Sequence, residues 1–320
     1  MRELIPVLLH VYDRHEHFKK CVESLLKCPE AKNTELFISS DFYKDESDKK
    51  GVLKVREYIK KIKGFKKVTP FNFEKNVGIE NASHYCKEKI FEKYQSIIIS
   101  EDDNFFSPLF LKYMNYTMNY YSKNKNVFAV SGSSPNVYRE TYLHEKDELF
   151  ATTSCDNWGY GIWKNRYLNF TSFKNSENLL EELQRDITNK VFRKKLDDIN
   201  IEYYPHFLYC VKNKIFPAND HLISYYCLKN NLYNIHNNNT YVKNYGFDGF
   251  GLNNRKNSKL QRIIERIKFS KSLPQPKDNL ELKNHLTNNY SNNKLKIYLK
   301  VLIIKMGLFD LVKNLIKKIS

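Results

Sequence analysis

Short apolar runs alternate with longer segments of helical spacing along the first 130 residues of the chain. The apolar runs predict strands at residues 5–11, 36–38, 68–73, 97–99 and 127–130. Between them, apolar residues at every third or fourth position predict helices at residues 16–26, 52–62, 79–94 and 108–122. This alternation favours an α/β fold, with a mainly parallel, Rossmann-like sheet and helices on both of its faces.

The second half of the chain is less regular. It predicts loops or short strands at 138–156, a polar helix or helical pair at 177–196, an Asn-rich turn at 230–239 and a helix at 260–267. We therefore expect one α/β domain over residues 1–254, a polar linker over 255–293 and a basic amphipathic helix over 294–320.

The C-terminal segment has apolar residues at helical spacing, with Lys313, Lys317 and Lys318 away from them. The apolar positions are Val301, Ile304, Leu308, Leu311, Leu315 and Ile319. A basic amphipathic helix of this kind can lie in an anionic membrane surface. The alternative is a helix docked on the core or on a partner subunit.

Charge and cysteine content narrow the class of protein. The chain of 320 residues has 53 Lys and Arg against 36 Asp and Glu, a formal charge of +17. Such a charge suits nucleic acid, anionic lipid or a phosphorylated substrate, although an AT-rich coding sequence also enriches lysine. The six cysteines form no C-x-x-C pair, which favours reduced, mostly buried thiols. With no signal peptide before the first strand and no apolar stretch of membrane-spanning length, we expect a cytoplasmic protein.

The triplet Glu101-Asp102-Asp103 is the strongest chemical signal. It directly follows the apolar run at 97–99, at the end of a strand where open α/β sheets bind ligands. Three crowded carboxylates are costly unless a cation neutralises them, and Mn²⁺ or Mg²⁺ prefers such oxygen ligands. The alternative is a solvated acidic turn.

Polar residues at the ends of other strands are candidates for nucleotide binding. Tyr12 and Arg14 follow the first strand and Asp41 follows the second. Arg14 could face a phosphate and Asp41 a base or ribose. Equally, Asp41 could cap a turn and Arg14 lie on the surface. Asn76 and Gly78 lie between a strand and a helix, where glycine permits a tight turn.

Three further segments carry candidate chemistry. Asp156, Trp158 and Gly159 lie in a segment that holds both tryptophans, and we expect Trp158 at a sugar site and Trp163 in the core. Asp220 precedes an amphipathic helix and could be its N-cap or a general base. Residues 244–251 hold three glycines between aromatics, as a loop closing over a ligand would, or an ordinary turn.

Taken in order, these segments resemble bacterial sugar transferases of the GT-A type, the family-2-like group with a Glu-Asp-Asp motif shared with N-acetylglucosaminyltransferase I. The resemblance spans residues 5–254 and implies the GT-A fold. It implies that Asp103 coordinates the metal, that Glu101 and Asp102 lie near the ribose and diphosphate, and that Asp41 contacts the base. Tyr12, Arg14, Asn76 and Gly78 would complete the donor site. Asp156, Trp158 and Gly159 would line the acceptor side, and Asp220 would deprotonate the acceptor. Relatives often carry a histidine metal ligand where this chain has Asn253 or Asn254.

The predicted function is that of a metal-dependent, inverting hexosyl- or N-acetylhexosaminyltransferase. It would use a nucleotide-sugar donor and a glycan or lipid-linked acceptor in surface polysaccharide or lipooligosaccharide synthesis, at the inner face of the cell membrane. One alternative is a nucleotidyltransferase acting on sugar phosphates. Another is a basic nucleic-acid-binding protein, although no nucleic-acid-binding module is recognisable.

Overall fold

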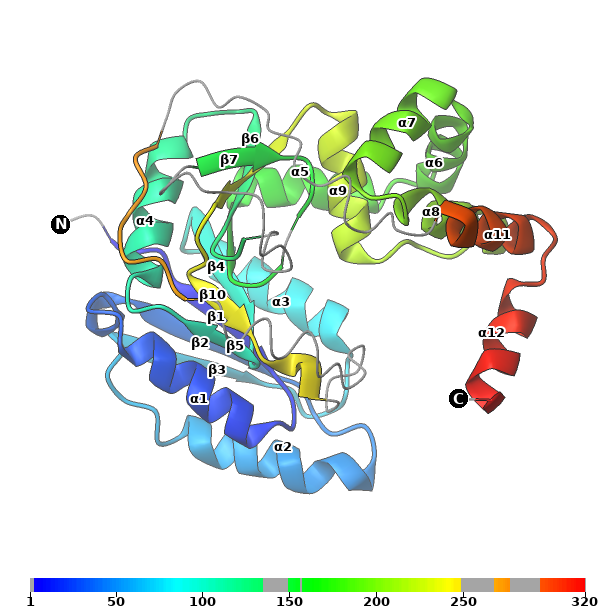
Figure 1. Cartoon of the computed structure of the whole chain (residues 1–320). Coiled ribbons are helices and arrows are strands. Elements are labelled where there is room, and N and C mark those ends of the chain that lie inside the picture. Colours follow the sequence, from blue (N-terminus) through cyan, green and yellow to red (C-terminus); the bar gives the residue numbers. More distant parts are fainter. Residues whose placement is uncertain (1–2, 135–148, 156, 249–267, 277–293, 320) are drawn as a thin grey trace. The chain divides into compact units, whose positions relative to one another are not determined.

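The computed structural model describes residues 3–134, 149–155, 157–248, 268–276 and 294–319 (Figure 1). They form two compact units, each described here by itself. The first holds Met1–Ala151, Asp156–Tyr167 and Asn234–Glu281, and the second holds Thr152–Cys155, Leu168–Tyr233 and Leu282–Ser320. The predicted helix at 260–267 and most of the predicted linker at 255–293 lie outside the described residues.

An eight-stranded sheet, in the order β3-β2-β1-β4-β8-β6-β9-β7, is the centre of the first unit. Its strands are β1 (Val7–Val11), β2 (Glu35–Ser40), β3 (Lys67–Asn72), β4 (Ser96–Glu101), β6 (Val127–Ser131), β7 (Leu149–Thr152), β8 (Tyr160–Trp163) and β9 (Tyr233–Asn237). Strands β3, β2, β1 and β4 pair in parallel, and β8 is antiparallel to both β4 and β6. The prediction of a mainly parallel α/β sheet is confirmed.

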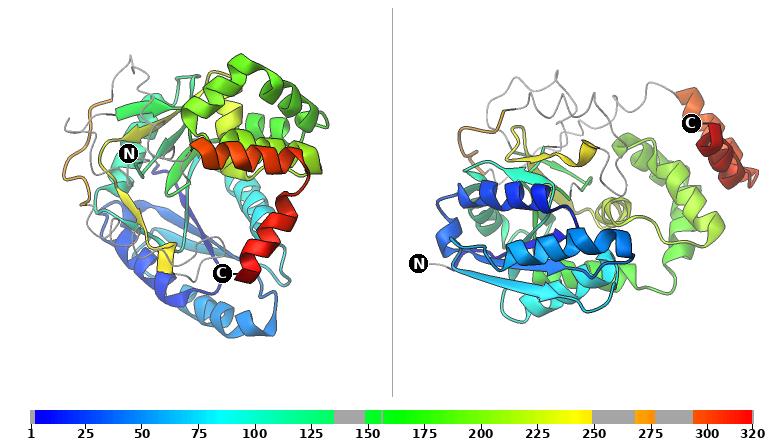
Figure 2. Two further views of the ribbon diagram at one scale, coloured as in Figure 1. Left: turned by 45° about the vertical axis from the view of Figure 1, so that its right-hand side comes forward. Right: turned by 90° about the horizontal axis from the view of Figure 1, so that it is seen from below.

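Helices cover the sheet on both faces, as predicted (Figures 1 and 2). α1 (His15–Leu26) and α2 (Glu46–Ile59) connect β1, β2 and β3 in one direction and pack against each other. α3 (Ile79–Phe91) returns the chain from β3 to β4 and packs on β1, β2 and β4. Right-handed crossovers that run in opposite directions place their helices on opposite faces. β1 is buried along its whole length, as a strand covered on both sides must be.

A small second sheet brings a distant segment to the end of β4. β5 (Asn104–Phe106) pairs antiparallel with β10 (Val242–Asn244), and the 3₁₀ turn η3 (Gly246–Asp248) follows. α4 (Phe110–Tyr121) begins after β5, and a short 3₁₀ turn, η1 (Ala31–Asn33), precedes β2. Residues near 103 and 245 are thereby neighbours in space.

The second unit is helical. It holds part of α5 (Lys164–Lys174) and then α6 (Leu179–Thr188), α7 (Lys190–Ile199), α8 (Tyr203–Asn213), α9 (Asn219–Lys229), α11 (Lys294–Lys305) and α12 (Phe309–Ile319). α6, α7 and α8 pack on one another, and α11 packs on α8. The predicted helical segment at 177–196 is the pair α6 and α7.

Three sequence predictions differ from the structure. The segment 230–239 is not a turn, because it contains the buried strand β9. Tyr160 to Trp163 form the central strand β8, which is not among the predicted strands. The single C-terminal helix is two helices, since Gly307 takes φ +78° between α11 and α12.

All six cysteines are thiols rather than disulfides, and five of them are buried, as the sequence predicted. Among the described helices, none combines the length and apolar character needed to cross a membrane.

Candidate active site

The acidic triplet lies where β4 ends. Glu101 is the last residue of β4 and is exposed, whereas Asp102 and Asp103 form the turn into β5 and are only 2% and 3% exposed. A solvated acidic turn is therefore excluded for Asp102 and Asp103. Two adjacent carboxylates buried at this edge of the sheet require a cationic or hydrogen-bonded partner.

Arg14 supplies that partner from the neighbouring strand. It follows β1, which pairs with β4, and it precedes α1. Its guanidinium contacts Asp102 Oδ1 closely, and its Nη1 lies 3.0 Å from Asp103 Oδ2. Burial raises the pKa of Asp102 to about 7, against the opposing effect of Arg14. Despite the cost of burying its charge, Arg14 has a raised pKa because it faces both carboxylates.

Asn244 fixes the other side of Asp103. Its Nδ2 donates to Asp103 Oδ1 (2.7 Å) and to Asn104 Oδ1 (3.0 Å), and its Oδ1 accepts from the backbone N–H of Gly246 (2.9 Å). The backbone N–H of Tyr245 donates to the carbonyl of Asp103 (2.9 Å). A Cβ on Gly246 would lie 2.3 Å from Asp103 Oδ2, so only glycine allows this approach. The pairing of β5 with β10 thus holds the Asp103 carboxylate in one orientation.

The residues of this cluster fit a hard divalent cation. Within the described chain, Asp102 Oδ2 is buried without a hydrogen-bond partner, so this carboxylate oxygen can accept a further ligand. No group of three or more His, Cys, Asp or Glu side chains gathers as a metal cage among the described residues. One or two carboxylates are nevertheless the usual protein share of a Mg²⁺ site whose other ligands are waters and substrate phosphates. Asn253 and Asn254 lie outside the described residues.

Asp41 holds two loops together. Its Oδ1 accepts from the backbone N–H of Phe42 (2.8 Å) and of Val77 (3.0 Å), and its Oδ2 accepts from that of Gly78 (2.9 Å). The Asn76 side chain donates to the carbonyl of Phe42 (2.6 Å). These contacts join the end of β2 to the start of α3 and bring together three residues that the resemblance assigned to the donor site. A contact with a nucleotide base stays a prediction.

Tyr12 lies at the end of β1, beside α2. Its hydroxyl donates to Asp48 Oδ2 (2.7 Å) and accepts from the backbone N–H of Lys44 (2.9 Å). Burial and Asp48 raise its pKa to about 12. These bonds orient the loop that follows Asp41.

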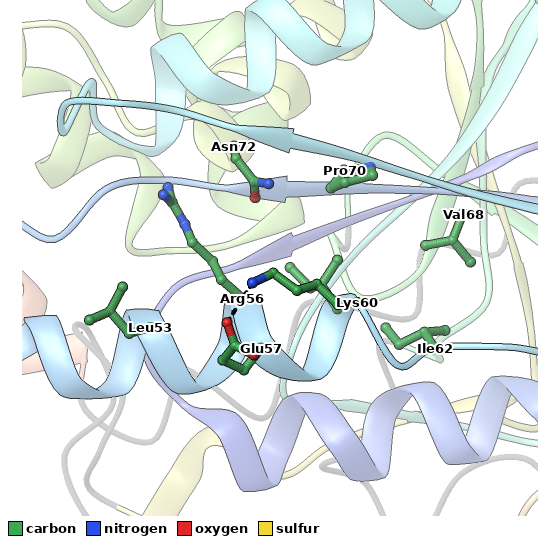
Figure 3. A pocket seen from close by; sticks show the side chains of 9 residues that line it. Leu53, Arg56, Glu57, Lys60, Ile62, Val68, Pro70 and Asn72 are labelled. Carbon is green, nitrogen blue, oxygen red and sulfur yellow. Dashed lines mark hydrogen bonds and ion pairs between the residues drawn. The ribbon is translucent and has the colours of Figure 1, made fainter.

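Two cavities lie beside strand β3. One of about 710 Å³ lies beside Val77, where β3 ends, and is lined also by Phe71, Asn72, Phe73, Glu74, Lys75 and Tyr85. The other, of about 390 Å³, lies between α2 and the edge strand β3 (Figure 3). Arg56 lines that second cavity and donates to the carbonyls of Ser40, Asp41 and Phe73. No residue predicted for the site lines the second cavity, which we read as part of the scaffold.

The two tryptophans differ in burial: Trp163 lies in the core as predicted, and a sugar contact of Trp158 stays a prediction. Trp163 is buried on β8, with the Arg166 guanidinium 3.5 Å from its ring centre. Trp158 is partly exposed and meets Phe247 of η3 edge-on at 5.9 Å. Gly159 takes φ +67°, and a Cβ there would lie 2.8 Å from Val242 Cγ2. The positive φ and the close packing of the Val242 side chain therefore explain why residue 159 is a glycine. Asp156 lies outside the described residues.

Asp220 belongs to the second unit. It lies in the first turn of α9 and is partly exposed, while the N-cap position is taken by Ala218. One carboxylate oxygen accepts from the backbone N–H of His221 (2.9 Å). The reading of Asp220 as the N-cap is therefore wrong, and a role as general base stays a prediction.

Sequence reasoning missed Asn244 as a partner of Asp103 and His17 as a partner of Asp248, whose side chains are 2.8 Å apart. The glycines at 246, 249 and 251 mark the segment 244–251 as a candidate. Nothing in its local sequence indicates that the Asn244 amide contacts the Asp103 carboxylate.

A family model described as the GNT-I family matches residues 1–154 of the chain. The match includes Arg14, Asp102 and Asp103 and ends before Trp158 and Asp220. It supports a glycosyltransferase, and hence an enzyme, as the resemblance implied. No curated protein matches the chain.

Three solved structures are similar at low sequence identity. GalNAc-T7 with UDP, GalNAc and Mn²⁺ has 13% identity and a TM-score of 0.44, over 74% of this chain and 43% of that one. Mannosyltransferase PcManGT from Pyrobaculum calidifontis, in complex with GDP-Man and Mn²⁺, has 9% identity and a TM-score of 0.40, over 71% and 70%. S. aureus TarS has 11% identity and a TM-score of 0.38, over 56% and 33%. The chain thus spans less than half of GalNAc-T7 and of TarS. At these low TM-scores the likenesses decide neither its activity nor its substrates.

Proposed function

We propose that this chain is a metal-dependent glycosyltransferase that moves a sugar from a nucleotide-sugar donor to a glycan acceptor. The single observation that carries the proposal is the buried pair Asp102 and Asp103, at the carboxyl end of β4, paired with Arg14. The family match over the same residues supports it.

The donor diphosphate fits this edge of the sheet. Arg14 is a guanidinium with a planar set of donors suited to phosphate oxygens. Arg14 lies against both carboxylates, so a diphosphate that binds beside them would contact the Arg14 guanidinium. The aromatic-lined cavity beside Val77 offers space of a size suited to a nucleoside.

A divalent cation bound by Asp103, with Asp102 beside it, would neutralise the charge that develops on the diphosphate leaving group. The chain's own contribution is to hold Asp103 in place through Asn244 and Asp102 through Arg14, and to shield both carboxylates from water. Mn²⁺ is the first candidate and Mg²⁺ the second, since both take carboxylate and phosphate oxygens.

For the acceptor side, we assign Asp220 as the base that removes the hydroxyl proton, so that the sugar carbon is attacked in a single inverting displacement. Its carboxylate keeps one oxygen outside the bond to His221. Trp158, partly exposed, would offer a ring face to the acceptor sugar. A surface polysaccharide or lipooligosaccharide, built on the cytoplasmic side of the membrane, is the proposed class of product.

A donor screen tests the function. UDP-, GDP- and CMP-sugars are each incubated with the protein and Mn²⁺, Mg²⁺ or chelator, and release of the free nucleotide is measured. We expect release from one class of donor, dependent on the metal. Release of pyrophosphate from a nucleoside triphosphate and a sugar phosphate would instead identify a nucleotidyltransferase.

A further inference from the structure

α11 is fixed to the second unit by one face. Ile304 is only 1% exposed, and α11 packs on α8. Lys212 of α8 donates its Nζ to the carbonyl of Ile304 (2.9 Å) and closely to that of Lys305, at the C-terminal end of α11. Lys300 forms an ion pair with Glu202. These bonds satisfy the end of the helix and set its orientation on α8.

The opposite face of α11 carries an exposed apolar stripe. Leu295, Tyr298, Leu299, Leu302 and Met306 are between 43% and 67% exposed. Their spacing of three, one, three and four residues places them on one side of a helix, at about 100° per residue. Ile304 lies nine residues after Leu295, about two and a half turns on, and so points the other way. Leu308 and Leu311, at 40% and 60% exposed, add apolar surface at the start of α12.

The lysines on either side of this stripe indicate which kind of surface it binds. Lys296 and Lys305 lie at its two flanks by the same helical spacing, and both are exposed. Residues 294–320 hold seven lysines and one aspartate, in a chain of charge +17. An apolar stripe flanked by lysines matches the boundary of an anionic bilayer, where the stripe enters the acyl region and the lysines meet the headgroups. Tyr298 is of the type that favours this interface.

We infer that α11 is an interfacial membrane anchor, which binds an anionic bilayer through Leu295, Tyr298, Leu299, Leu302 and Met306. The sequence assigned a stripe through Val301 and Ile304, and the structure corrects that choice, because Ile304 is buried against the protein. α11 therefore joins the second unit to the membrane with two separate faces. This inference is independent of the transferase proposal, and its test uses no activity.

Vesicle sedimentation with the full chain tests the anchor. Phosphatidylcholine vesicles are compared with vesicles of phosphatidylcholine and phosphatidylglycerol. We expect binding to the anionic vesicles that is partly released at high salt. The triple variant Leu295→Ser, Leu299→Ser, Leu302→Ser should lose more than about tenfold in partitioning. The matched triple variant Leu53→Ser, Leu168→Ser, Val191→Ser removes exposed apolar side chains from α2, α5 and α7 and should bind as the wild type does.

Thermal unfolding controls for loss of structure, since serine at exposed positions should leave the transition in place. Three results would overturn the inference. The first is equal binding by wild type and stripe variant, and the second is equal binding to neutral and anionic vesicles. The third is a wild type that is dimeric without lipid and does not bind vesicles, together with a monomeric stripe variant, which would make a second copy the partner.

Discussion

Arg14 lies between the two carboxylates that a divalent cation would bind. Its guanidinium already neutralises Asp102 and Asp103, so a cation arriving alone would compete with a fixed positive charge. A donor diphosphate could draw Arg14 away and bring its own oxygen ligands. We therefore expect the metal to bind weakly to the free protein and well in the presence of the donor.

Replacing Arg14 by glutamine should expose this competition. Mn²⁺ binding without nucleotide, followed by electron paramagnetic resonance, should strengthen by about tenfold, which equals about 1.4 kcal/mol. Lys19→Gln removes an exposed charge of α1 that pairs with Glu23, and it serves as the control. The Arg14→Gln variant will lose some stability, because Asp102 stays buried without its charged partner. Mn²⁺ binding is therefore compared under conditions in which the wild type and the variant are both folded. An unchanged Mn²⁺ affinity would contradict the competition.

His10 makes the first unit sensitive to acid. It is buried on β1 and, within the described residues, neither ring nitrogen has a hydrogen-bond partner. Burial, with a smaller effect of Lys87, lowers its pKa from 6.5 to about 3. The unfolded chain takes up a proton on His10 below pH 6.5 and the folded protein does not. The free energy of unfolding therefore decreases as the pH is lowered from 6.5 to about 3.

The His10→Leu variant should lose less stability in acid than the wild type does. Between pH 7.5 and pH 5 the difference should be about 2 kcal/mol, at about 1.4 kcal/mol per pH unit below 6.5. Urea unfolding at the two pH values measures it. Parallel losses in the two proteins would show that His10 is not the acid-sensitive group.

At the residue scale, the sequence predicted the acidic cluster because its signal is local: an apolar run followed by three carboxylates. It could not predict the partners of these carboxylates, because Arg14 is 88 residues and Asn244 is 141 residues from the aspartate that each contacts. The partner of a buried charge depends on which strands pair, and a single sequence does not state that.

Three strands of the parallel half of the sheet follow from periodicity, since β1, β2 and β4 each contain a buried run of three apolar residues, whereas the edge strand β3 is half exposed. β8 and β9 were missed for a physical reason. The sequence of β9, Tyr-Asn-Ile-His-Asn, is typical of a turn, and burial between neighbouring strands overrides that tendency. In β8, Gly161 resembles a ligand-approach glycine, but a Cβ there would lie 2.1 Å from Met118 Sδ of α4.

Gly159, at the start of β8, gives a test of this packing. Alanine there would strain the backbone at φ +67° and approach Val242, so Gly159→Ala should cost about 1–3 kcal/mol of unfolding free energy. Adding Val242→Ala should relieve the contact and leave the backbone strain. A Gly159→Ala protein of full stability and low activity would instead place Gly159 at the acceptor.

The first turn of α9 is where the acceptor base is proposed. Asp220→Asn should lower turnover by about 10²–10⁴-fold and leave donor affinity within about twofold, since a base acts on the acceptor. The matched variant Asp198→Asn, on the exposed side of α7, should behave as the wild type does. Retained turnover in Asp220→Asn would remove this assignment, and Asp156 would be the next candidate.

The net charge and the two units of the molecule both suit the proposed substrates, which are an anionic nucleotide-sugar donor and a membrane-displayed glycan. A net charge of +17 favours encounter with an anionic donor and an anionic membrane, and the effect should weaken as salt rises. The α/β unit carries the buried carboxylates, and the helical unit carries Asp220 and the exposed stripe of α11. Together, the proposed donor site and the proposed anchor suit transfer to a glycan displayed at a membrane.

The central claim is that Asp103 is required to cleave a nucleotide sugar. The most direct measurement is nucleotide release from the best donor in saturating Mn²⁺ by the wild type, by Asp103→Asn and by the exposed control Glu92→Gln. We predict full activity in the control and a loss of about 10³-fold or more in Asp103→Asn, with both variants folded. Near-wild-type release by Asp103→Asn would contradict the account.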